Sequence, residues 1–515
     1  MKNLMLAALL FCSASSLTAQ PVYPDSTFSG NGIHEFNFYN NIDRGFGCAV
    51  QSDQKIVMAG LSKNPATGSF ELCFARYLLN GNLDSTFSGD GKSYVSMGQQ
   101  QSIGGQAPRI KIQSDGKIVA VNSGNNPVNS SLDMLVCRID SNGVLDNTFG
   151  GTGVVYVDVT GNPQWPDLGS ALDIDPQGNI YVAGATRNGG TPLDNDFAII
   201  KLTANGVLDP TFDTDGKKLF NLTGMAEFGK GIKVMPNGNI VFGGSSGMNS
   251  VLAMIDPSGA LVPSFAGTGW TTVSFTSGWY MYDLQLDSLS RIVAAGTGNG
   301  GSGGICVVRY LDNGTPDNSF GTAGKFTAVV GGSTNDINTL VMTANNGLLV
   351  SGWVTTPAFG TDYLVARIDS SGALDLTFNN TGYYTGHVAL GATNEECNSM
   401  AQLADGRIFL SGTLVFSSAI NEDVGIMLLK QDAATGLVVI DTPVLLSVYP
   451  NPCSSHLTFT SARKTSVVLS DVSGRVFFEG TYSEGTHQIP VTNLDSGLYF
   501  LRDDQTGHTI RVIKL

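Results

Sequence analysis

The sequence predicts an all-β protein whose main body repeats one four-stranded unit seven times. Two turn phrases that each occur seven times lead to this prediction, together with an absence of helical periodicity. Of the 515 residues, 64 are Gly, only 14% are charged and 42% are hydrophobic. Such a chain can bury an extensive core and join many short strands by tight turns. We therefore predict a seven-bladed β-propeller, closed by its N-terminal strand and followed by a small C-terminal β-sandwich.

The N-terminus has the pattern of a cleavable signal peptide, which we predict to span residues 1–19. Lys2 supplies a positive charge, an apolar run extends from Leu4 to Phe11, and small residues lead to Ala19. This run is too short to span a bilayer. No other segment offers 18 consecutive apolar residues, so we expect no transmembrane segment in the mature chain.

The first turn phrase reads Asp-x-Thr-Phe in most copies. Its phenylalanines are 59, 62, 63, 53, 55 and 58 residues apart, and they are Phe28, Phe87, Phe149, Phe212, Phe265, Phe320 and Phe378. The second phrase is clearest at Asp115-Gly-Lys-Ile118, and its other copies centre on Ile56, Ile180, Ile240, Ile292, Leu348 and Ile408. This spacing leaves room for four short strands per unit, as a propeller blade requires.

One unit shows the expected strand order. Ala171–Asp175 is a first strand, Ile180–Gly184 a second and Phe197–Leu202 a third, and a fourth follows the next turn phrase. The second and third strands are nearly continuous apolar runs. Such runs are expected where neighbouring blades cover both faces of a sheet.

The two ends of the repeat region are incomplete in complementary ways. Asp25–Phe28 and Ile33–Tyr39 form the tail of a unit that has no beginning, whereas the last unit, which reaches Lys430, has no turn phrase after it. We therefore expect the N-terminal strand to pair with the third strand of the last unit near Leu428. An open β-solenoid is the alternative, but its ends would need capping.

A cation near the end of each third strand matches the aspartate of a turn phrase. The one unit that lacks the cation has Met254, and it also lacks the aspartate, which is replaced by Val262. This joint loss predicts that the two groups contact each other. The predicted pairs are Arg76–Asp84, Arg138–Asp146, Lys201–Asp209, Arg309–Asp317, Arg367–Asp375 and, across the closure, Lys430–Asp25.

The units resemble delta-60 repeats. The resemblance rests on Asp115-Gly-Lys-Ile-Val119, Ala75-Arg-Tyr77 and Leu145-Asp-Asn-Thr-Phe149, and the seven copies cover residues 25 to about 436. It implies a propeller-like fold in exported bacterial proteins, and it implies no reaction.

The C-terminal segment carries a series of motifs whose residues are Pro450, Asn451, Pro452, Asp471, Gly474, Gly497, Leu498, Tyr499 and Lys514. The segment resembles the type A sorting domain of the Bacteroidetes type IX secretion system, and the motifs follow that family's order. The resemblance implies passage through the periplasm, recognition by the secretion machinery, and delivery to the cell surface or medium. A generic adhesive sandwich is the alternative. We expect a propeller over residues 20–438, a linker over 439–447 and the sorting domain over 448–515.

Composition excludes some partners. The net charge of −15 disfavours nucleic acid, whose phosphates an acidic surface repels. The six cysteines of the mature chain show no CxxC or other paired spacing, so we expect buried free thiols, with one or more disulfides as the alternative. These cysteines are Cys48, Cys73, Cys137, Cys306, Cys397 and Cys453.

The sequence offers no catalytic or metal-binding motif, so we predict no catalytic residue, metal or cofactor. Neither His34 nor His387 sits beside a nucleophile signature such as GxSxG, no HExxH occurs, and we interpret both histidines as structural. A turn phrase that recurs in every unit is more simply architectural than catalytic.

Aromatic residues that do not repeat are the candidate ligand-binding groups. We place them in loops on one face, among Asn, Gly, Ser and Thr, a combination that suits stacking and neutral hydrogen bonding to sugars. They are Trp165, Trp279, Tyr280, Tyr282 and Trp353. In the alternative interpretation these aromatics only cover their own loops.

Three functions follow, led by an exported module that binds a glycan or a protein. The second is a polysaccharide hydrolase or lyase at the propeller mouth, in which Asp167, Glu227 and Glu395-Glu396 would supply acid and base. The third is a purely structural surface protein.

Overall fold

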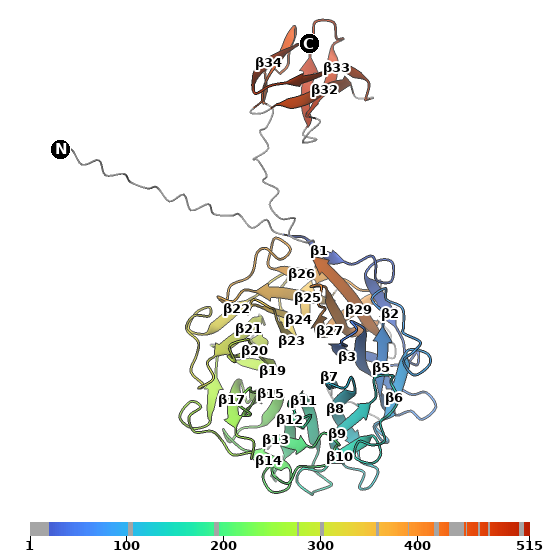
Figure 1. The fold of residues 1–515 in the computed structure, drawn as a ribbon, viewed down its shortest axis with the longest axis vertical. Helices are drawn as coiled ribbons and strands as arrows, with labels where there is room; N and C mark the ends of the chain where they lie inside the picture. Colours follow the sequence, from blue (N-terminus) through green and yellow to red (C-terminus); the bar gives the residue numbers. More distant parts are fainter. Residues whose placement is uncertain are drawn as a thin grey trace, which may run out of the picture. The chain divides into compact units, whose positions relative to one another are not determined.

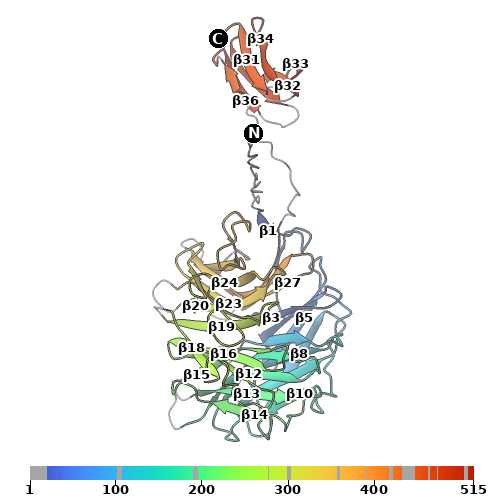
Figure 2. The same ribbon diagram turned by 60° about the vertical axis from the view of Figure 1, so that its left-hand side comes forward.

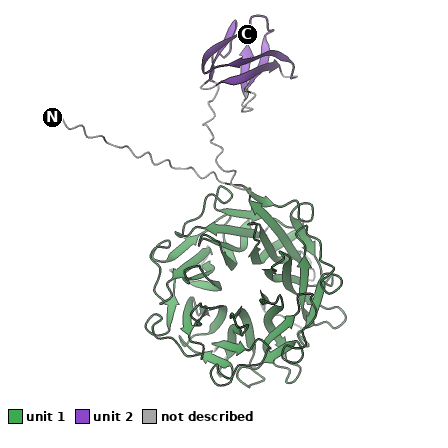
Figure 3. Ribbon diagram, in the orientation of Figure 1, with its two compact units in different colours: residues 1–432 green, residues 433–515 purple. Residues whose placement is uncertain are grey.

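The computed structural model describes residues 20–431 and 447–515, except 101–106, 190–194, 276–277, 299–302, 357–359, 390, 417–421, 450, 462–463, 472–473 and 504–508. The chain divides into two compact units, residues 1–432 and 433–515 (Figure 3). The predicted signal peptide, most of the predicted linker and Pro450 lie outside the described residues. The boundaries at residues 438 and 448 stay predictions. Within the described ranges, no helix is long and apolar enough to cross a membrane.

Seven antiparallel sheets, counted over the described residues, follow one another around a ring in the first unit (Figures 1 and 2). The all-β propeller predicted from the sequence is therefore confirmed. We number the blades 1 to 7 in chain order. The first strand of each blade lies nearest the centre of the ring, as β19 and β23 show in Figure 1.

The strand bounds of the first four blades are as follows. Blade 1 contains β3 (Asp43–Val50), β4 (Ile56–Lys63), β5 (Phe70–Tyr77) and β6 (Lys92–Ser96). Blade 2 contains β7 (Arg109–Ile112), β8 (Ile118–Asn125), β9 (Leu132–Ile139) and β10 (Val154–Val157). Blade 3 contains β11 (Asp167–Ile174), β12 (Ile180–Arg187), β13 (Asn195–Leu202) and β14 (Lys217–Phe220). Blade 4 contains β15 (Glu227–Val234), β16 (Ile240–Ser246), β17 (Asn249–Ile255) and β18 (Trp270–Val273).

The remaining blades repeat this order. Blade 5 contains β19 (Trp279–Leu286), β20 (Ile292–Gly298), β21 (Ile305–Tyr310) and β22 (Lys325–Ala328). Blade 6 contains β23 (Asn335–Met342), β24 (Leu348–Thr356), β25 (Gly360–Ile368) and β26 (Tyr383–Gly386). Blade 7 contains β27 (Ala392–Gln402), β28 (Ile408–Phe416) and β29 (Glu422–Gln431), joined by β1 (Val22–Pro24) and β2 (Ile33–Phe36).

The hydrophobic core lies between neighbouring blades. Val119 and Val121 of β8 form one fully buried cluster with Ile180 and Val182 of β12. Because each middle strand is covered on both faces, it has no solvent-facing side to make polar, which explains the continuous apolar runs. The six cysteines are free thiols, as predicted, and all but Cys48 are buried.

The N-terminal segment closes the ring as predicted. In β2, Ile33 pairs with Met427 and Phe36 with Val424 of β29. β1 extends the same edge of β29, where Val22 pairs with Gln431. The pairing ends at Phe36, three residues earlier than the predicted strand. The last blade is thus built from both ends of the repeat region.

Each predicted cation lies against its predicted aspartate. The N–O distances are 2.9 Å for Arg76–Asp84, 2.8 Å for Arg138–Asp146, 2.8 Å for Lys201–Asp209, 2.7 Å for Arg309–Asp317, 2.8 Å for Arg367–Asp375 and 3.5 Å for Lys430–Asp25. In blade 4, Met254 and Val262 belong to one hydrophobic cluster instead. An apolar contact therefore takes the place of the ion pair at this one position.

The pair is part of a larger contact between blades, which we call the seam clamp and define on blade 2. Asp146 accepts hydrogen bonds from the Thr148 amide at 3.1 Å and the Thr148 hydroxyl at 2.6 Å. Arg138 lies 4.8 Å from the centre of the Phe149 ring and donates a hydrogen bond to the Ala204 carbonyl of blade 3. The Phe149 ring packs in the core between blades 2 and 3.

A backbone hydrogen bond crosses each seam of the ring. The donor follows the phenylalanine of the turn phrase, and the acceptor belongs to the next blade. The pairs, at 2.7–3.0 Å, are Ser29–Asn80, Ser88–Asn142, Gly150–Asn205, Asp213–Ser258, Ala266–Asn313, Gly321–Ser371 and, at the closure, Asn379–Gln20.

The second unit is a small β-sandwich. One sheet contains β30 (Ser447–Tyr449), β31 (His456–Ser461) and β34 (Gly485–Pro490); the other contains β33 (Val476–Tyr482), β32 (Thr465–Asp471), β35 (Gly497–Asp503) and β36 (Thr509–Lys514). A core that includes Leu457, Phe459, Leu469 and Leu501 lies between them.

The sorting motifs lie at the strand ends of this sandwich. The Asn451 side chain accepts from the Ile513 amide at 2.9 Å and donates to the Arg511 carbonyl at 2.7 Å, which ties the Pro-Asn-Pro segment to β36. Asp471 accepts from the Arg475 amide at 3.0 Å, in a turn where Gly474 has a φ of 83°. Gly497, Leu498 and Tyr499 begin β35, and Lys514 ends β36.

We predict that Asp146→Ala lowers the free energy of unfolding by about 1–3 kcal/mol, because it leaves the buried Arg138 without its carboxylate. Arg138→Met combined with Asp146→Val, which copies the apolar contact of blade 4, should cost less than the sum of its single changes. Urea unfolding measures these changes, and all four tryptophans lie in the first unit, so their fluorescence reports on the propeller. The exposed Asp312→Ala is the control. Additive single changes would show that the two groups are not coupled.

The contact between β29 and the closing strand β2 makes the stability of the propeller depend on pH. Burial and a hydrogen bond with Glu35 raise the pKa of Asp423 in β29 to about 7. A raised folded-state pKa means that ionisation of Asp423 costs stability as the pH rises from about 4 to 7. We therefore predict that Asp423→Asn stabilises the propeller at pH 8 and has no effect at pH 4, measured by urea unfolding. A mutant less stable than the parent at pH 8 would refute this.

Candidate functional site

The innermost strand of most blades carries a β-bulge at the same place. The bulge shifts the register by one residue and turns the side chain at that position out of the regular pleat. The residues inside the shifts are Phe46 with Gly47, Ser170, Lys230, Tyr282, Asn338 and Asn398. Unlike the turn phrases, this position holds a different side chain in nearly every blade.

A glycine on the neighbouring strand makes room for each bulge. A Cβ at Gly184 of β12 would lie 1.7 Å from the Leu168 carbonyl oxygen, and one at Gly244 would lie 1.8 Å from that of Phe228. Blade 2 has Asn122 at this place, and its first strand begins later, at Arg109. The glycine that follows four residues after the Ile or Leu of the second turn phrase is therefore required by close backbone approach.

The bulged side chains line a hollow at one end of the central channel, which we call the mouth hollow. Its volume is about 380 Å³, and all seven blades contribute to its lining. Besides the bulge residues Phe46, Ser170, Lys230, Tyr282, Asn338 and Asn398, the lining includes Arg44, Arg109, Phe228, Trp353, Glu396 and Thr413. Aromatic, amide, hydroxyl and charged groups thus converge on one space.

The structure places two of the five predicted aromatic residues in the lining of the mouth hollow. Tyr282 and Trp353 line the mouth hollow, although both lie on strands rather than in loops. Tyr280 lies two residues before Tyr282 in β19, and Trp165 precedes β11; neither lines the mouth hollow.

The prediction that Trp279 is a ligand platform is wrong. Its side chain is fully buried, and its indole nitrogen donates to the Val273 carbonyl at 2.9 Å. In other blades this position at the head of the innermost strand holds a carboxylate or amide, such as Asn335, which donates to the Val330 carbonyl at 2.7 Å. Trp279 therefore takes the place of a buried polar side chain at the head of the innermost strand.

The predicted acid–base candidates Asp167, Glu227 and Glu395 are also buried, and their carboxylates accept hydrogen bonds from the backbone of the preceding loop. Asp167 accepts from the Val159 amide at 2.8 Å, and Glu395 accepts from the Val388 and Ala389 amides at 2.8 and 2.9 Å. Glu227 accepts from the Leu222 and Thr223 amides. All three are fully buried, and burial raises their pKa values, that of Asp167 to about 6. Glu396 is the fourth predicted acid–base candidate, and it alone among these four residues lines the mouth hollow.

One group among the described residues has the geometry of a possible metal site. The ligand atoms of Asp362, His387 and Glu395 all lie within 4.8 Å of one another. His387 Nδ1 is 3.2 Å from Asp362 and 3.0 Å from Glu395. Because both Glu395 oxygens already accept backbone N–H groups, the arrangement fits a histidine that ties a loop to β25.

The cations of the mouth hollow differ in their partners. Arg44 pairs with Glu422, whereas Arg109 donates to the backbone carbonyls of Asn338 at 3.1 Å and Asn398 at 3.3 Å. Among the described residues, no carboxylate forms a salt bridge with Arg109 or Lys230. Burial lowers the pKa of Lys230, and the charge of Arg109 lowers it further.

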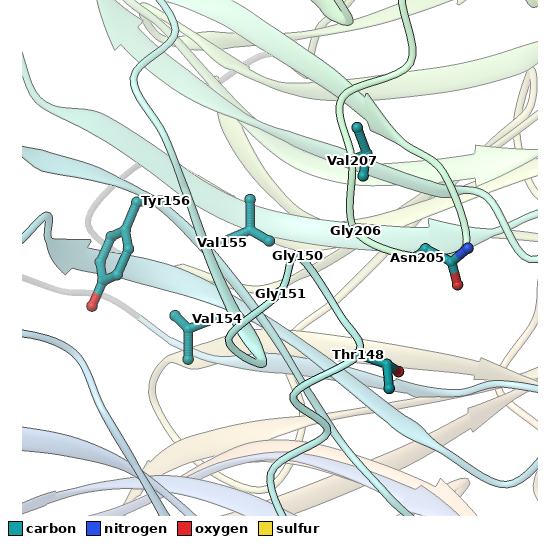
Figure 4. Close-up of a pocket in the computed structure, with 9 residues that line it drawn as sticks. All are labelled: Thr148, Gly150, Gly151, Val154, Val155, Tyr156, Asn205, Gly206 and Val207. Carbon is teal, nitrogen blue, oxygen red and sulfur yellow. The ribbon is translucent and has the colours of Figure 1, made fainter.

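A second, larger hollow lies on the outer rim, between blades 2 and 3 (Figure 4). Its lining comes from the turn and strand around Thr148–Tyr156 and from Asn205–Val207 of the next blade. None of the nine lining residues is charged. We interpret this hollow as part of the seam, because Gly150 and Asn205 form a seam hydrogen bond there.

Comparison with known families finds one match in each unit. Residues 447–514 match the secretion system C-terminal sorting domain. Residues 51–87, 113–149, 176–212 and 290–320 match a β-propeller described as a domain of unknown function, DUF5122. A search of curated proteins finds no match.

The chain also aligns with several solved structures at low similarity. Virginiamycin B lyase from Staphylococcus aureus is 12% identical, with 77% of this chain and 98% of that chain covered and a TM-score of 0.42. An ulvan-specific polysaccharide lyase is 10% identical, with 76% and 95% covered and a TM-score of 0.45. PorZ, a type IX secretion component of Porphyromonas gingivalis, is 10% identical, with 92% and 81% covered and a TM-score of 0.25. Likenesses this low do not bear on what this chain binds.

The different burial of Trp279 and Trp353 predicts different costs for replacing each by alanine. Trp279→Ala should lower the free energy of unfolding by about 3–5 kcal/mol, because it empties a fully buried site. Trp353→Ala should cost less than about 2 kcal/mol, because its side chain is partly exposed. Urea unfolding followed by circular dichroism measures both changes. Equal costs would place Trp353 in the core and argue against the mouth hollow as a binding site.

Proposed function

We propose that this chain, with its matches to DUF5122 propeller repeats and to a secretion sorting domain, is an exported binding protein. Its proposed ligand is a saccharide that binds in the mouth hollow. The observation that carries this proposal is the row of bulges, which turns side chains that do not repeat into one space. Repeated residues are sufficient to build the ring, so the varied residues are free to recognise a ligand.

The lining of the mouth hollow has the chemistry of a sugar site. Tyr282 and Trp353 offer ring faces for stacking, and Asn338, Asn398 and Thr413 offer neutral hydrogen-bonding groups. Sugars present both apolar ring faces and many hydroxyls, which such a mixture satisfies.

Binding is better supported than hydrolysis or elimination. Glycoside hydrolysis uses two carboxyl groups at the scissile bond, and among the described residues Glu396 is the single carboxylate in the lining of the mouth hollow. Burial and the negative charge of Asp336 raise the pKa of Tyr282, which disfavours its phenolate as the base of a lyase. A purely structural role leaves the varied lining without an explanation.

The sorting domain accounts for delivery. The chain is a type IX secretion cargo and reaches the cell surface or the medium. We propose that residues 1–19 act as its signal peptide, that the chain passes through the periplasm, and that the secretion machinery recognises the exposed ends of the C-terminal sandwich.

We predict that a chain ending before Tyr449 accumulates in the periplasm, because it lacks the domain that the secretion machinery recognises. The measurement is cell fractionation and immunoblotting in a host with this secretion system. The full chain, expressed in the same host, is the control. Equal amounts of both chains at the surface would overturn the sorting assignment.

We predict that Trp353→Ala weakens saccharide binding by at least about 10-fold, as expected for loss of an aromatic stacking contact. A glycan array with the mature chain identifies the ligand, and calorimetry measures the affinity. Trp165→Ala removes a partly exposed tryptophan outside the mouth hollow and should leave binding unchanged. Greater loss in Trp165→Ala than in Trp353→Ala would place the site elsewhere.

A further inference from the structure

We propose that the saccharide bound in the mouth hollow is anionic and carries a carboxylate or sulfate group that lies between Arg109 and Lys230. This inference rests on the proposed function and specifies its ligand class. It is argued from the positions of the two cations, from the partners of the other charged groups, and from the charge of the whole chain.

Arg109 and Lys230 lie where two parts of the channel meet. Below the mouth hollow, the channel has a second space of about 220 Å³, which we call the inner hollow. Both cations line both hollows. Arg109 begins β7 and Lys230 occupies the bulge of β15, so they approach the channel from blades 2 and 4.

Each of the other cations of the channel already has a carboxylate partner, which Lys111 and Lys233 share. Lys111 is 3.1 Å and Lys233 is 3.8 Å from Asp173, and Arg44 pairs with Glu422. A ligand anion that entered the channel would therefore compete with a protein carboxylate at each of these positions. At Arg109 and Lys230 it would meet no such competitor among the described residues.

The two free cations raise the energy of the empty site. Taking a charge out of water is costly unless an opposite charge compensates it. The lowered pKa of Lys230 reflects this cost, because burial and the charge of Arg109 both disfavour the ammonium form. A bound anion would compensate both charges and restore the pKa of Lys230. Burial raises the pKa of Glu396, the carboxylate of the lining. A raised pKa favours the neutral carboxyl, which repels a bound anion less than the carboxylate does.

Arg109 is oriented to accept such an anion. Its two terminal nitrogens donate to the Asn338 and Asn398 carbonyls, which fixes the plane of the guanidinium. A guanidinium has five N–H donors, so donors remain for a planar carboxylate or a sulfate. Lys230 supplies a second, flexible charge from across the channel.

The overall charge makes this positive site selective. The chain has 43 acidic and 28 basic residues, so its surface repels anions in general. Concentrating two free cations inside the channel allows an anion to bind there without a generally basic surface.

The test compares matched oligosaccharides by calorimetry with the mature chain. The probes are neutral oligogalactose, oligogalacturonate and sulfated oligogalactose. We expect the parent to bind a charged probe at least about 10-fold more tightly than the neutral one, and the affinity to fall as NaCl is raised. Whether carboxylate or sulfate binds better identifies the charged group.

Lys230→Gln should remove most of the preference for the charged probe over the neutral one. Arg109→Gln should act in the same way; because Arg109 also holds two carbonyls, Lys230→Gln is decisive if that variant is unstable. Lys63→Gln, at the end of β4 and outside both hollows, is the matched control.

Other results would overturn the inference in distinguishable ways. Equal binding of neutral and charged probes, unchanged in Lys230→Gln but weakened in Trp353→Ala, would refute the anionic ligand and keep the saccharide site. Binding of no saccharide would remove the proposed function as well. Binding of an acidic peptide instead, sensitive to Lys230→Gln, would refute the saccharide and keep the anion site.

Discussion

The seam clamp is the interaction on which the ring depends. In blade 2, one aspartate holds its own turn through Thr148 and pairs with Arg138, and this arginine covers Phe149 and reaches the carbonyl of Ala204 in the next blade. Local turn structure, strand position and contact between blades are thus set by the same few atoms. Because the last blade takes its turn phrase from the N-terminus, the chain cannot complete this set of contacts without closing the ring.

The clamps also explain where variation is tolerated. They occupy the outer turns and third strands, so the side chains that the bulges turn into the channel take no part in them. A bulge opposite Gly244 presents Lys230 to the channel, and the equivalent bulge in blade 5 presents Tyr282. Repeated residues therefore build the ring, and residues that do not repeat face the space where a ligand can bind.

The fold and its clamps could be predicted from the sequence because their signals are local and repeated. Joint replacement at Met254 and Val262 was enough to indicate a contact that the structure shows in the other blades. The candidate site could not be predicted in the same way. Lys230 faces the channel because the strand register shifts around it, and register depends on the partner strand. Trp279 was misplaced because an aromatic residue at a strand head has the same sequence signature whether it caps a core or faces solvent.

Native-state hydrogen exchange at the seven seam amides tests whether the clamps act as one unit. These amides belong to Ser29, Ser88, Gly150, Asp213, Ala266, Gly321 and Asn379. If the ring depends on every seam, all seven should exchange only through global unfolding, with free energies equal to within about 1 kcal/mol and the same dependence on denaturant. Exchange of Ser29 and Asn379 at a much lower, denaturant-independent free energy would show that the closing seams open alone, and that the other clamps hold the ring without them.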